Sequence, residues 1–166
     1  MTAEPPANVT IIDADLSRPD QQDALVRMLE AFVSDPMQGG EHLSERAKRD
    51  LIPGLRAHPA CYIYLAYRDN TAVGFSICFR GFSTFMAKPL INIHDIFVDA
   101  SARGLGIGAM LMQRIEDKAR ELSCSAITLE VRADNRIAQG LYRKLGFDQA
   151  VSGDDGIPME FWRKPL

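Results

Sequence analysis

Apolar residues recur at helical spacing in four segments of the chain, which predicts four amphipathic helices. The predicted helices cover Gln21–Val33, a segment that follows Ser44, Gly106–Leu122, and a segment from Asn135 to Leu145. Pro53 is expected to kink the second helix or end it early, because proline lacks the N–H that a helix interior needs. Asn135 is placed to cap the fourth helix and Gly146 to stop it.

Seven shorter segments are rich in β-branched and aromatic residues, which favour strands. The predicted strands are Val9–Asp13, Tyr62–Tyr67, Thr71–Phe79, Leu90–Val98, Ala126–Val131, Phe147–Ser152 and Met159–Arg163. Asp69 and Asn70 suit a tight turn, so the second and third strands should pair antiparallel. The strands on either side of the third helix should form a right-handed parallel β-α-β unit. The pattern therefore predicts a mixed α/β fold.

The most informative polar feature is the run from Asp99 to Gly108, which lies between an apolar strand and an amphipathic helix. Alternating glycines at Gly104, Gly106 and Gly108 let the backbone approach a ligand closely, and the first turn of the helix offers unpaired N–H groups. Arg103 adds a full positive charge. No Lys-Ser or Lys-Thr pair follows the last glycine, as a P-loop requires. The turn therefore predicts a site for the pyrophosphate of a larger cofactor, and both coenzyme A and dinucleotides fit.

Composition limits the classes of protein that can be built around this turn. A chain of 166 residues, 46% of them hydrophobic, is expected to form one globular domain over residues 1–166. The net charge of −3 and the pI near 5.6 argue against a nucleic-acid partner. Cys61, Cys78 and Cys124 show no spacing typical of a disulfide framework or a zinc site, so no metal is expected. The chain start lacks signal-peptide features and no apolar run reaches membrane-spanning length, which predicts a soluble cytoplasmic protein without a membrane partner.

One candidate cofactor is a dinucleotide. The segment Gly104–Ala109 satisfies the G-x-G-x-x-A fingerprint, and Glu130 follows the next strand, where a ribose-binding acid would lie. In the dinucleotide fold, however, the first glycine follows its strand almost at once, whereas Asp99–Arg103 intervene here. An antiparallel hairpin and two helices also precede this unit, and too little chain remains for a doubly wound sheet. A dinucleotide-binding protein is therefore the more remote alternative.

Two motifs in register favour an acyl-coenzyme A instead. Arg103-Gly-Leu-Gly-Ile-Gly108 resembles the R/Q-x-x-G-x-G/A motif of the GNAT acetyltransferase superfamily, and Asn135–Phe147 resembles its N-x-x-A-x-x-L/F-Y-x-K-L-G-F block. The resemblance covers Ala72–Phe147 well and the rest by the order of elements. The segment Phe82–Val98 is most similar to the diamine acetyltransferase branch. The resemblance implies a mixed, mostly antiparallel sheet of about six or seven strands, with a central β-α-β unit that binds acyl-CoA and about four helices.

The resemblance also implies roles in an acetyl-CoA-dependent N-acetyltransferase. The implied acetyl-CoA contacts are Ile96, Phe97, Val98, Arg103, Gly104, Leu105, Gly106, Ile107, Gly108, Asn135 and Tyr142. The turn would hold the pyrophosphate through its N–H groups, with the Arg103 guanidinium as a further contact. A backbone N–H of Ile96, Phe97 or Val98 would polarise the thioester carbonyl. Tyr142 would donate a proton to the departing thiolate, since a phenol with a pKa of about 10 stays protonated at neutral pH.

The attacking amine must lose a proton to a base or to a water relay, and His94 and Asp95 are the candidate bases. A strand histidine without a catalytic role is an equally good interpretation of His94. Alternation along the strand places the two side chains on opposite faces of the sheet, which argues against an adjacent dyad. The acceptor, a primary amine of a small molecule or of a protein, should meet the segments Ser34–Leu43 and Gly81–Pro89.

The alternative to an enzyme is a catalytically weak acyl-CoA-binding regulatory module that keeps the fold. The intact glycine turn and Tyr142 argue against this alternative. The similarity to the diamine acetyltransferase branch also implies a homodimer, with Gly153–Leu166 as the candidate interface.

Overall fold

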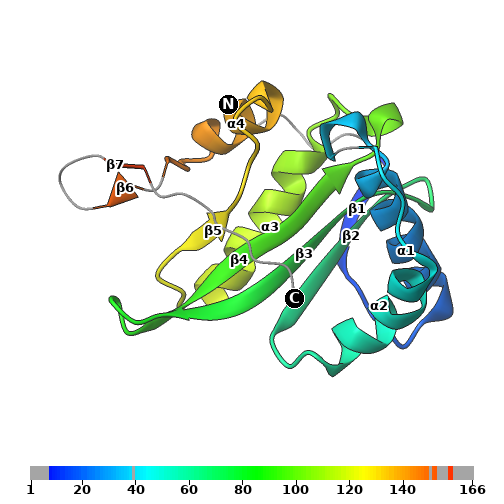
Figure 1. The fold of residues 1–166 in the computed structure, drawn as a ribbon, viewed down its shortest axis with the longest axis horizontal. Coiled ribbons are helices and arrows are strands. Elements are labelled where there is room, and N and C mark those ends of the chain that lie inside the picture. Colours follow the sequence, from blue (N-terminus) through cyan, green and yellow to red (C-terminus); the bar gives the residue numbers. More distant parts are fainter. Residues whose placement is uncertain (1–7, 39, 150, 153–156, 159–166) are drawn as a thin grey trace. The chain divides into compact units, whose positions relative to one another are not determined.

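The computed structural model describes residues 8–38, 40–149, 151–152 and 157–158. The chain divides into two compact units between Glu130 and Val131, and each unit is described by itself. The first unit contains a five-stranded sheet and the helices that pack on it, and the second contains the last helix and a short strand pair (Figure 1). No helix within these described ranges is long and apolar enough to cross a membrane.

The sheet of the first unit is mostly antiparallel. Its strands, in spatial order, are β1 (Val9–Asp13), β2 (Cys61–Arg68), β3 (Thr71–Ser83), β4 (Lys88–Val98) and β5 (Ile127–Leu129). The first four strands pair antiparallel, and β4 and β5 run parallel. Asp69 and Asn70 adopt φ angles of 49° and 67° between β2 and β3, which confirms the predicted tight hairpin.

Helices cover both faces of this sheet. They are α1 (Pro19–Val33), α2 (Glu45–Ala57) and α3 (Ile107–Glu121). Helices α1 and α2 lie on one face and α3 lies on the other (Figure 1). The buried stripe of α3 includes Ile107, Leu111 and Ile115, in agreement with the predicted periodicity. Because α3 connects β4 to the parallel strand β5, the predicted β-α-β unit is confirmed.

Helix α2 begins where the sequence predicts but ends later. The Ser44 side chain accepts a hydrogen bond from the Ala47 N–H at 3.1 Å and caps the helix. Of the two effects expected of Pro53, an early end of the helix is wrong, because the helix continues to Ala57. Pro53 lies on the exposed side of the helix, where water can satisfy the carbonyl that loses its N–H partner.

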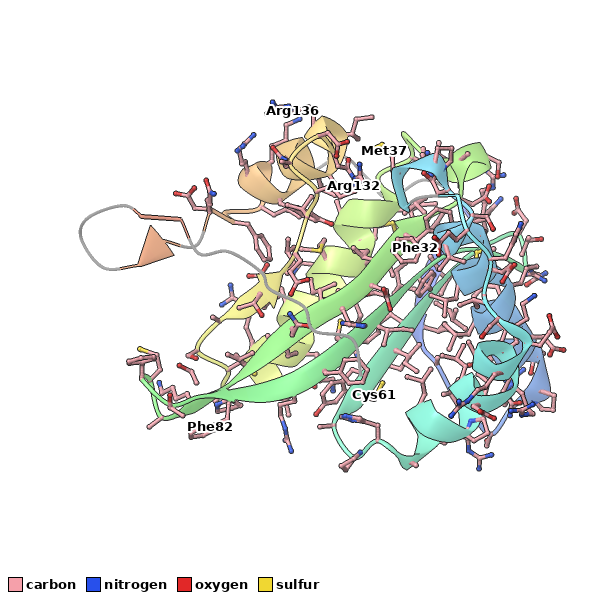
Figure 2. The ribbon with its side chains drawn as sticks, viewed as in Figure 1. Phe32, Met37, Cys61, Phe82, Arg132 and Arg136 are labelled. Atoms are coloured by element: carbon pink, nitrogen blue, oxygen red, sulfur yellow. The ribbon has the colours of Figure 1, made fainter. Side chains whose placement is uncertain are left out.

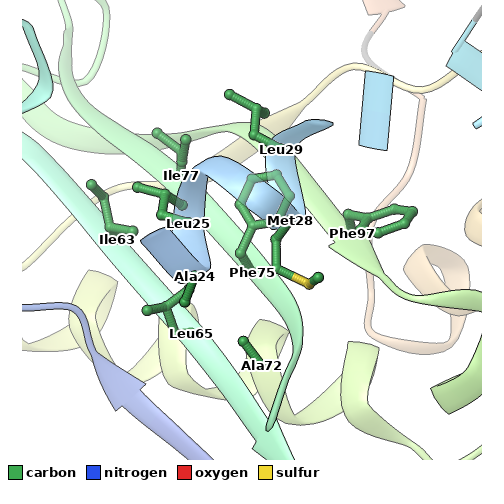
Figure 3. Close-up of a cluster of buried hydrophobic side chains, with 10 residues drawn as sticks. All are labelled: Ala24, Leu25, Met28, Leu29, Ile63, Leu65, Ala72, Phe75, Ile77 and Phe97. Carbon is green, nitrogen blue, oxygen red and sulfur yellow. The ribbon is translucent and has the colours of Figure 1, made fainter. Parts of the chain in front are cut away.

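A cluster of buried apolar side chains lies between α1 and the sheet (Figure 3). Its members are Ala24, Leu25, Met28, Leu29, Ile63, Leu65, Ala72, Phe75, Ile77 and Phe97. Phe32 lies at the edge of this cluster, and its ring centroid is 6.0 Å from that of Phe75 and 5.8 Å from that of Phe97. These aromatic contacts tie the C-terminal end of β4 to α1.

The second unit contains α4 (Arg136–Lys144), β6 (Val151–Ser152) and β7 (Ile157–Pro158). Asn135 Oδ1 accepts a hydrogen bond from the Ala138 N–H at 3.1 Å, which confirms the predicted N-cap. Gly146 adopts a φ of +87° just after the helix, which confirms the predicted stop.

The strand prediction differs from the structure towards the C-terminus. In the described residues the main sheet has five strands rather than six or seven, because β6 and β7 pair with each other. The predicted strand over residues 147–152 is limited to residues 151–152, and that over residues 126–131 is limited to residues 127–129. The predicted strand Met159–Arg163 lies outside the described residues. The mixed α/β class with a mostly antiparallel sheet is confirmed.

Candidate functional site

The candidate site is built around the turn that follows β4. Asp99 opens this turn, and its N–H donates to the Val73 carbonyl of β3 at 2.9 Å. The Asp99 carboxylate accepts hydrogen bonds from the hydroxyl and the N–H of Ser101, at 2.5 and 2.9 Å. These bonds cap the 3₁₀ helix η2 (Ala100–Ala102) and lower the pKa of Asp99. Asp99 therefore fixes the point at which the chain leaves the sheet.

Two glycines give the turn its shape. Gly104 and Gly106 adopt φ angles of +80° and +76°, which residues with a Cβ rarely adopt. A Cβ added to either glycine would meet no atom within 4 Å, so the space beside both is open. Gly106 is the N-cap of α3, whose first N–H groups lack intrahelical partners and carry the positive end of the helix dipole. A pyrophosphate fits this combination of open space and N–H donors.

Strand β5 ends before the turn, and β4 extends beyond the end of β5. They pair at Ile91–Ile93 with Ile127–Leu129, and in the described residues no strand pairs with this edge of β4 beyond Ile93. The remaining part of β4 keeps its other edge on β3 as far as Val98. The result is an open edge of β4, along which the backbone groups have no strand partner in the described residues.

The ladder between β3 and β4 determines which residues face this open edge. Because the Asp99 N–H bonds to the Val73 carbonyl, the backbone groups of Phe97 also face β3. Those of Ile96 and Val98 alternate with them and point to the open edge. Of the three residues predicted to contact acetyl-CoA through this strand, two thus have backbone groups free of β3, whereas Phe97 contributes its ring to the core.

The side chain of Arg103 contacts protein groups on three sides. Its Nη2 donates to Asp35 Oδ2 at 2.6 Å, and its Nε donates to the Val98 carbonyl at 3.1 Å. The guanidinium carbon lies 5.7 Å from the centroid of the Phe97 ring. The hydrogen bond from Arg103 lowers the pKa of Asp35. Sequence analysis did not predict this pair, since the two residues are 68 positions apart and no local pattern relates them.

The register of β3 and β4 shifts at His94. Ile77 lies opposite Asp95, and the next pair along the ladder skips His94, which is therefore the extra residue of a β-bulge. Ile77 belongs to the core cluster under α1, so Asp95 lies on that face of the sheet. The His94 ring centroid lies 5.6 Å from that of Phe79, which packs against the same cluster. The predicted placement of His94 and Asp95 on opposite faces is wrong, because simple alternation does not count a bulge.

The bulge places a titratable pair beside an aromatic surface. His94 is exposed and Asp95 is partly buried. Burial raises the pKa of Asp95, and the neighbouring His94 opposes this increase with a smaller effect. The Ser76 hydroxyl donates to the Asp95 carbonyl at 3.0 Å and supports the backbone there. The Phe79 ring contacts a second imidazole as well, since the His58 ring at the end of α2 lies 4.7 Å from it between centroids.

The other two predicted site residues belong to the second unit. Asn135 caps α4, and Tyr142 lies within the same helix. The Tyr142 side chain is buried, and its ring centroid lies 5.9 Å from that of Phe147. Burial raises the pKa of the Tyr142 phenol, so it holds its proton at neutral pH.

Comparison with known proteins identifies the family to which this fold and glycine turn belong. The model described as Acetyltransferase (GNAT) family matches residues 25–147, and the chain belongs to this family. N-alpha-acetyltransferase RimI of Mycobacterium tuberculosis is 39% identical over 113 residues, which cover 62% of this chain and 67% of that protein. The chain spans between 37% and 58% of the length of three other curated relatives.

Solved structures share the fold over nearly the whole chain. A crystal structure of a probable acetyltransferase superposes with a TM-score of 0.75 at 24% identity, covering 95% of this chain and 97% of that one. The structure of AAC(6')-Iy in complex with the bisubstrate analogue CoA-S-monomethyl-acetylneamine has a TM-score of 0.71 at 16% identity, covering 95% and 99%. The expected GNAT fold is confirmed, and the similarity to the diamine acetyltransferase branch stays a prediction.

Proposed function

We propose that this chain binds acetyl-CoA and transfers the acetyl group directly to a primary amine. One observation supports this proposal most strongly: the glycine turn has open space beside it and directly follows β4. In the described residues, the edge of β4 next to this turn has no strand partner. In this proposal the N–H groups of the segment Gly104–Gly108, including Leu105 and Ile107, bind the pyrophosphate. In this proposal Asn135 contacts acetyl-CoA in addition to capping α4. Membership of the family and a structural neighbour that holds a CoA-containing analogue support this assignment.

The open edge of β4 suits the extended arm of acetyl-CoA. We expect the arm to bind along Ile96 and Val98 as an additional strand would, through backbone hydrogen bonds. Negative charge develops on the thioester oxygen when the amine attacks, and an N–H of Ile96 or Val98 would stabilise it. This donor is preorganised, because the opposite edge of β4 is held by its ladder to β3.

Two side chains supply the proton transfers in this proposal. An amine with a pKa of about 10.4 costs roughly 4.6 kcal/mol to deprotonate at pH 7, so a base is useful. His94 is the proposed base, since it is exposed at the bulge and lies on the same face as Asp95. Tyr142 is the proposed acid for the departing thiolate, and the raised pKa of its phenol favours the protonated form that this role needs.

The acceptor is proposed to be an amine of a small molecule or of a protein. The name of the RimI relative specifies N-alpha-acetylation, whereas the AAC(6')-Iy neighbour holds an analogue that joins CoA to acetylneamine. Both acceptor types are therefore represented among similar proteins. Gly81–Pro89 is a candidate acceptor segment, and its Phe85 and Met86 side chains are 99% and 61% exposed. A homodimer remains a prediction to be checked by light scattering, and most of its expected interface lies outside the described residues.

Calorimetric titration with acetyl-CoA, CoA and NADH tests the donor assignment. We expect both coenzyme A forms to bind and NADH not to bind. Thiol release is then followed with a panel of amines that includes a peptide with a free α-amine and neamine. Release with one class identifies the acceptor, whereas NADH binding alone would overturn the proposal.

The variant Tyr142→Phe separates an enzyme from a regulatory binding module. It removes the phenolic proton and little else, so turnover should fall at least about tenfold while acetyl-CoA affinity stays within about threefold. Phe147→Leu serves as a control, because it alters the aromatic neighbour of Tyr142 without touching the hydroxyl. Unchanged turnover in Tyr142→Phe would remove this residue from the mechanism. Acetyl-CoA binding without thiol release by the unmodified chain would favour the regulatory alternative.

A further inference from the structure

We propose that Asp35 and Arg103 form a positioning pair that holds the connection between α1 and α2 against the acetyl-CoA turn. The connection, residues 34–44, includes the 3₁₀ helix η1 (Pro36–Gln38). The inference rests on the proposed function, because it assigns the acceptor amine to this connection and the acyl donor to the turn. Arg103 then acts on the acceptor side through Asp35, and the phosphate contacts come from the backbone of the turn.

The Asp35 carboxylate accepts hydrogen bonds from both the connection and the glycine turn. Its Oδ1 accepts a hydrogen bond from the Met37 N–H at 2.8 Å, while its Oδ2 accepts the bond from Arg103 Nη2 at 2.6 Å. The Asp35 carbonyl also accepts a bond from the Gly40 N–H at 3.3 Å. The side chain is 16% exposed, which limits competition from water. Phe32 and Met37 mark the end of α1 and the connection in Figure 2.

The Arg103 side of the pair is equally constrained. Its Nε is bonded to the Val98 carbonyl at 3.1 Å, and its guanidinium lies over the Phe97 ring. Phe97 in turn contacts Phe32 at the end of α1. The ion pair therefore lies above an aromatic contact between the same two parts of the first unit. A phosphate that took Nη2 would have to displace Asp35, whereas the backbone N–H groups of the turn need no displacement.

The far end of the connection is held differently. Glu30 of α1 bonds the His42 ring at 2.9 Å and accepts the Leu43 N–H at 3.2 Å. These contacts hold the connection against the helix that precedes it, and they do not involve the glycine turn. The pair of Asp35 and Arg103 instead joins the connection to the end of β4, where the thioester is proposed to lie. Loss of the pair should therefore loosen the acceptor side more than the donor side.

The test uses Asp35→Asn, Arg103→Gln and the double variant in the full chain, with Asp50→Asn as a matched control. Asp50 forms ion pairs on the surface of α2 with Arg46 and Arg49 and takes no part in the connection. Hydrogen exchange of amides in residues 34–43 should accelerate about fivefold in each single variant and no further in the double variant. With the amine that gives thiol release, KM should rise about fivefold, while the acetyl-CoA dissociation constant changes less than about threefold.

Two results would overturn the inference. If Arg103→Gln weakens acetyl-CoA binding tenfold or more and Asp35→Asn does not, Arg103 is a direct phosphate contact. If exchange in residues 34–43 is unchanged in all three variants, the pair positions nothing. Failure of the unmodified chain to bind acetyl-CoA would instead refute the proposed function, and the exchange measurement would still decide whether the pair holds the connection.

Discussion

The bulge at His94 and the glycine turn at Gly104–Gly106 lie on either side of the last residues of β4, yet they present different chemistry. The bulge presents side chains, because an extra residue brings His94 and Asp95 to one face of the sheet. The turn presents backbone, because its positive φ angles leave N–H groups beside open space. Substitutions at the bulge should therefore change the reaction, and substitutions at the turn should change the binding of the donor.

The largest expected effect is that of His94→Asn. Loss of the base should lower kcat at pH 7 about 100-fold, the usual size of a general-base contribution. The acetyl-CoA dissociation constant should stay within about threefold, since the bulge does not form the turn. The loss should shrink as the pH approaches the pKa of the acceptor amine, because more of the amine is then neutral. Steady-state kinetics across pH and calorimetry measure the two quantities.

The matched control for this substitution is His58→Asn. His58 contacts the same Phe79 ring but lies at the end of α2 instead of on β4. A decrease in kcat as large as that of His94→Asn would mean that packing around Phe79 matters and that proton transfer by His94 does not.

Gly74 of β3 lies opposite Val98, which lies between the bulge and the turn. Substitution of Gly74 tests whether both features need the backbone of β4 in its present position. A Cβ on Gly74 would lie 2.8 Å from the Phe97 carbonyl oxygen, so Gly74→Ala must displace the β4 backbone. We expect a loss of about 1–3 kcal/mol in the free energy of unfolding and weaker acetyl-CoA binding. In Gly81→Ala the Cβ would meet only the Leu90 side chain, at 3.3 Å from Cδ1. Urea unfolding should therefore show a larger loss of unfolding free energy in Gly74→Ala than in Gly81→Ala. Equal losses would contradict the argument that the β4 backbone approaches Gly74 too closely for a Cβ.

The turn itself is tested by Gly106→Ala. Alanine at a φ of +76° costs about 1–2 kcal/mol, so the turn should rearrange and the acetyl-CoA dissociation constant should rise about tenfold. At saturating acetyl-CoA, kcat should change little. Gly54→Ala is the control, because Gly54 lies in α2, has no positive φ and has open space beside it. That variant should be slightly more stable and bind acetyl-CoA normally, and the same loss of affinity in both variants would count against the turn as the binding site.

The features that could be predicted from the sequence are those set by neighbouring residues. The cap at Asn135, the hairpin at Asp69–Asn70 and the glycine turn each depend on a few consecutive residues, and the structure has all of them. The buried stripe of α3 could also be predicted, because its helical period repeats over several turns.

The features that escaped prediction depend on distant partners. The bulge at His94 exists because of the register between β3 and β4, which a single strand does not encode. The contact of Asp35 with Arg103 requires the fold that brings a helix end to a strand end. The number of strands in the main sheet also depends on which strands pair. In the described residues β6 and β7 pair with each other and form a separate sheet.

The smallest expected effects concern two carboxyl groups, one in each region, whose pKa values are shifted in opposite directions. Burial raises the pKa of Asp95 at the bulge, whereas the hydrogen bond from Arg103 lowers that of Asp35 beside the turn. A raised pKa means that the folded state binds the proton more tightly than the unfolded state. The associated stability is present below the unfolded value of 3.8 and is lost as the pH rises through the folded value. For Asp35 the stability is present above 3.8 and is lost as the pH falls through the folded value.

Asn substitutions should therefore give opposite slopes when the free energy of unfolding is measured by urea between pH 2 and 8. Relative to the unmodified chain, Asp95→Asn should gain stability as the pH rises, because it removes a carboxylate that is costly to bury. The neighbouring His94 lowers the pKa of Asp95 and should reduce this gain. Relative to the unmodified chain, Asp35→Asn should lose stability as the pH rises from 2 to about 5, because Arg103 then lacks the charged partner that it gains in the unmodified chain. Above that pH the difference between the two chains should stay level, because Asp35 is ionised in both the folded and the unfolded state. Parallel slopes for the two variants would show that the carboxyl groups at the bulge and beside the turn have similar environments, and the distinction between the two regions would fail.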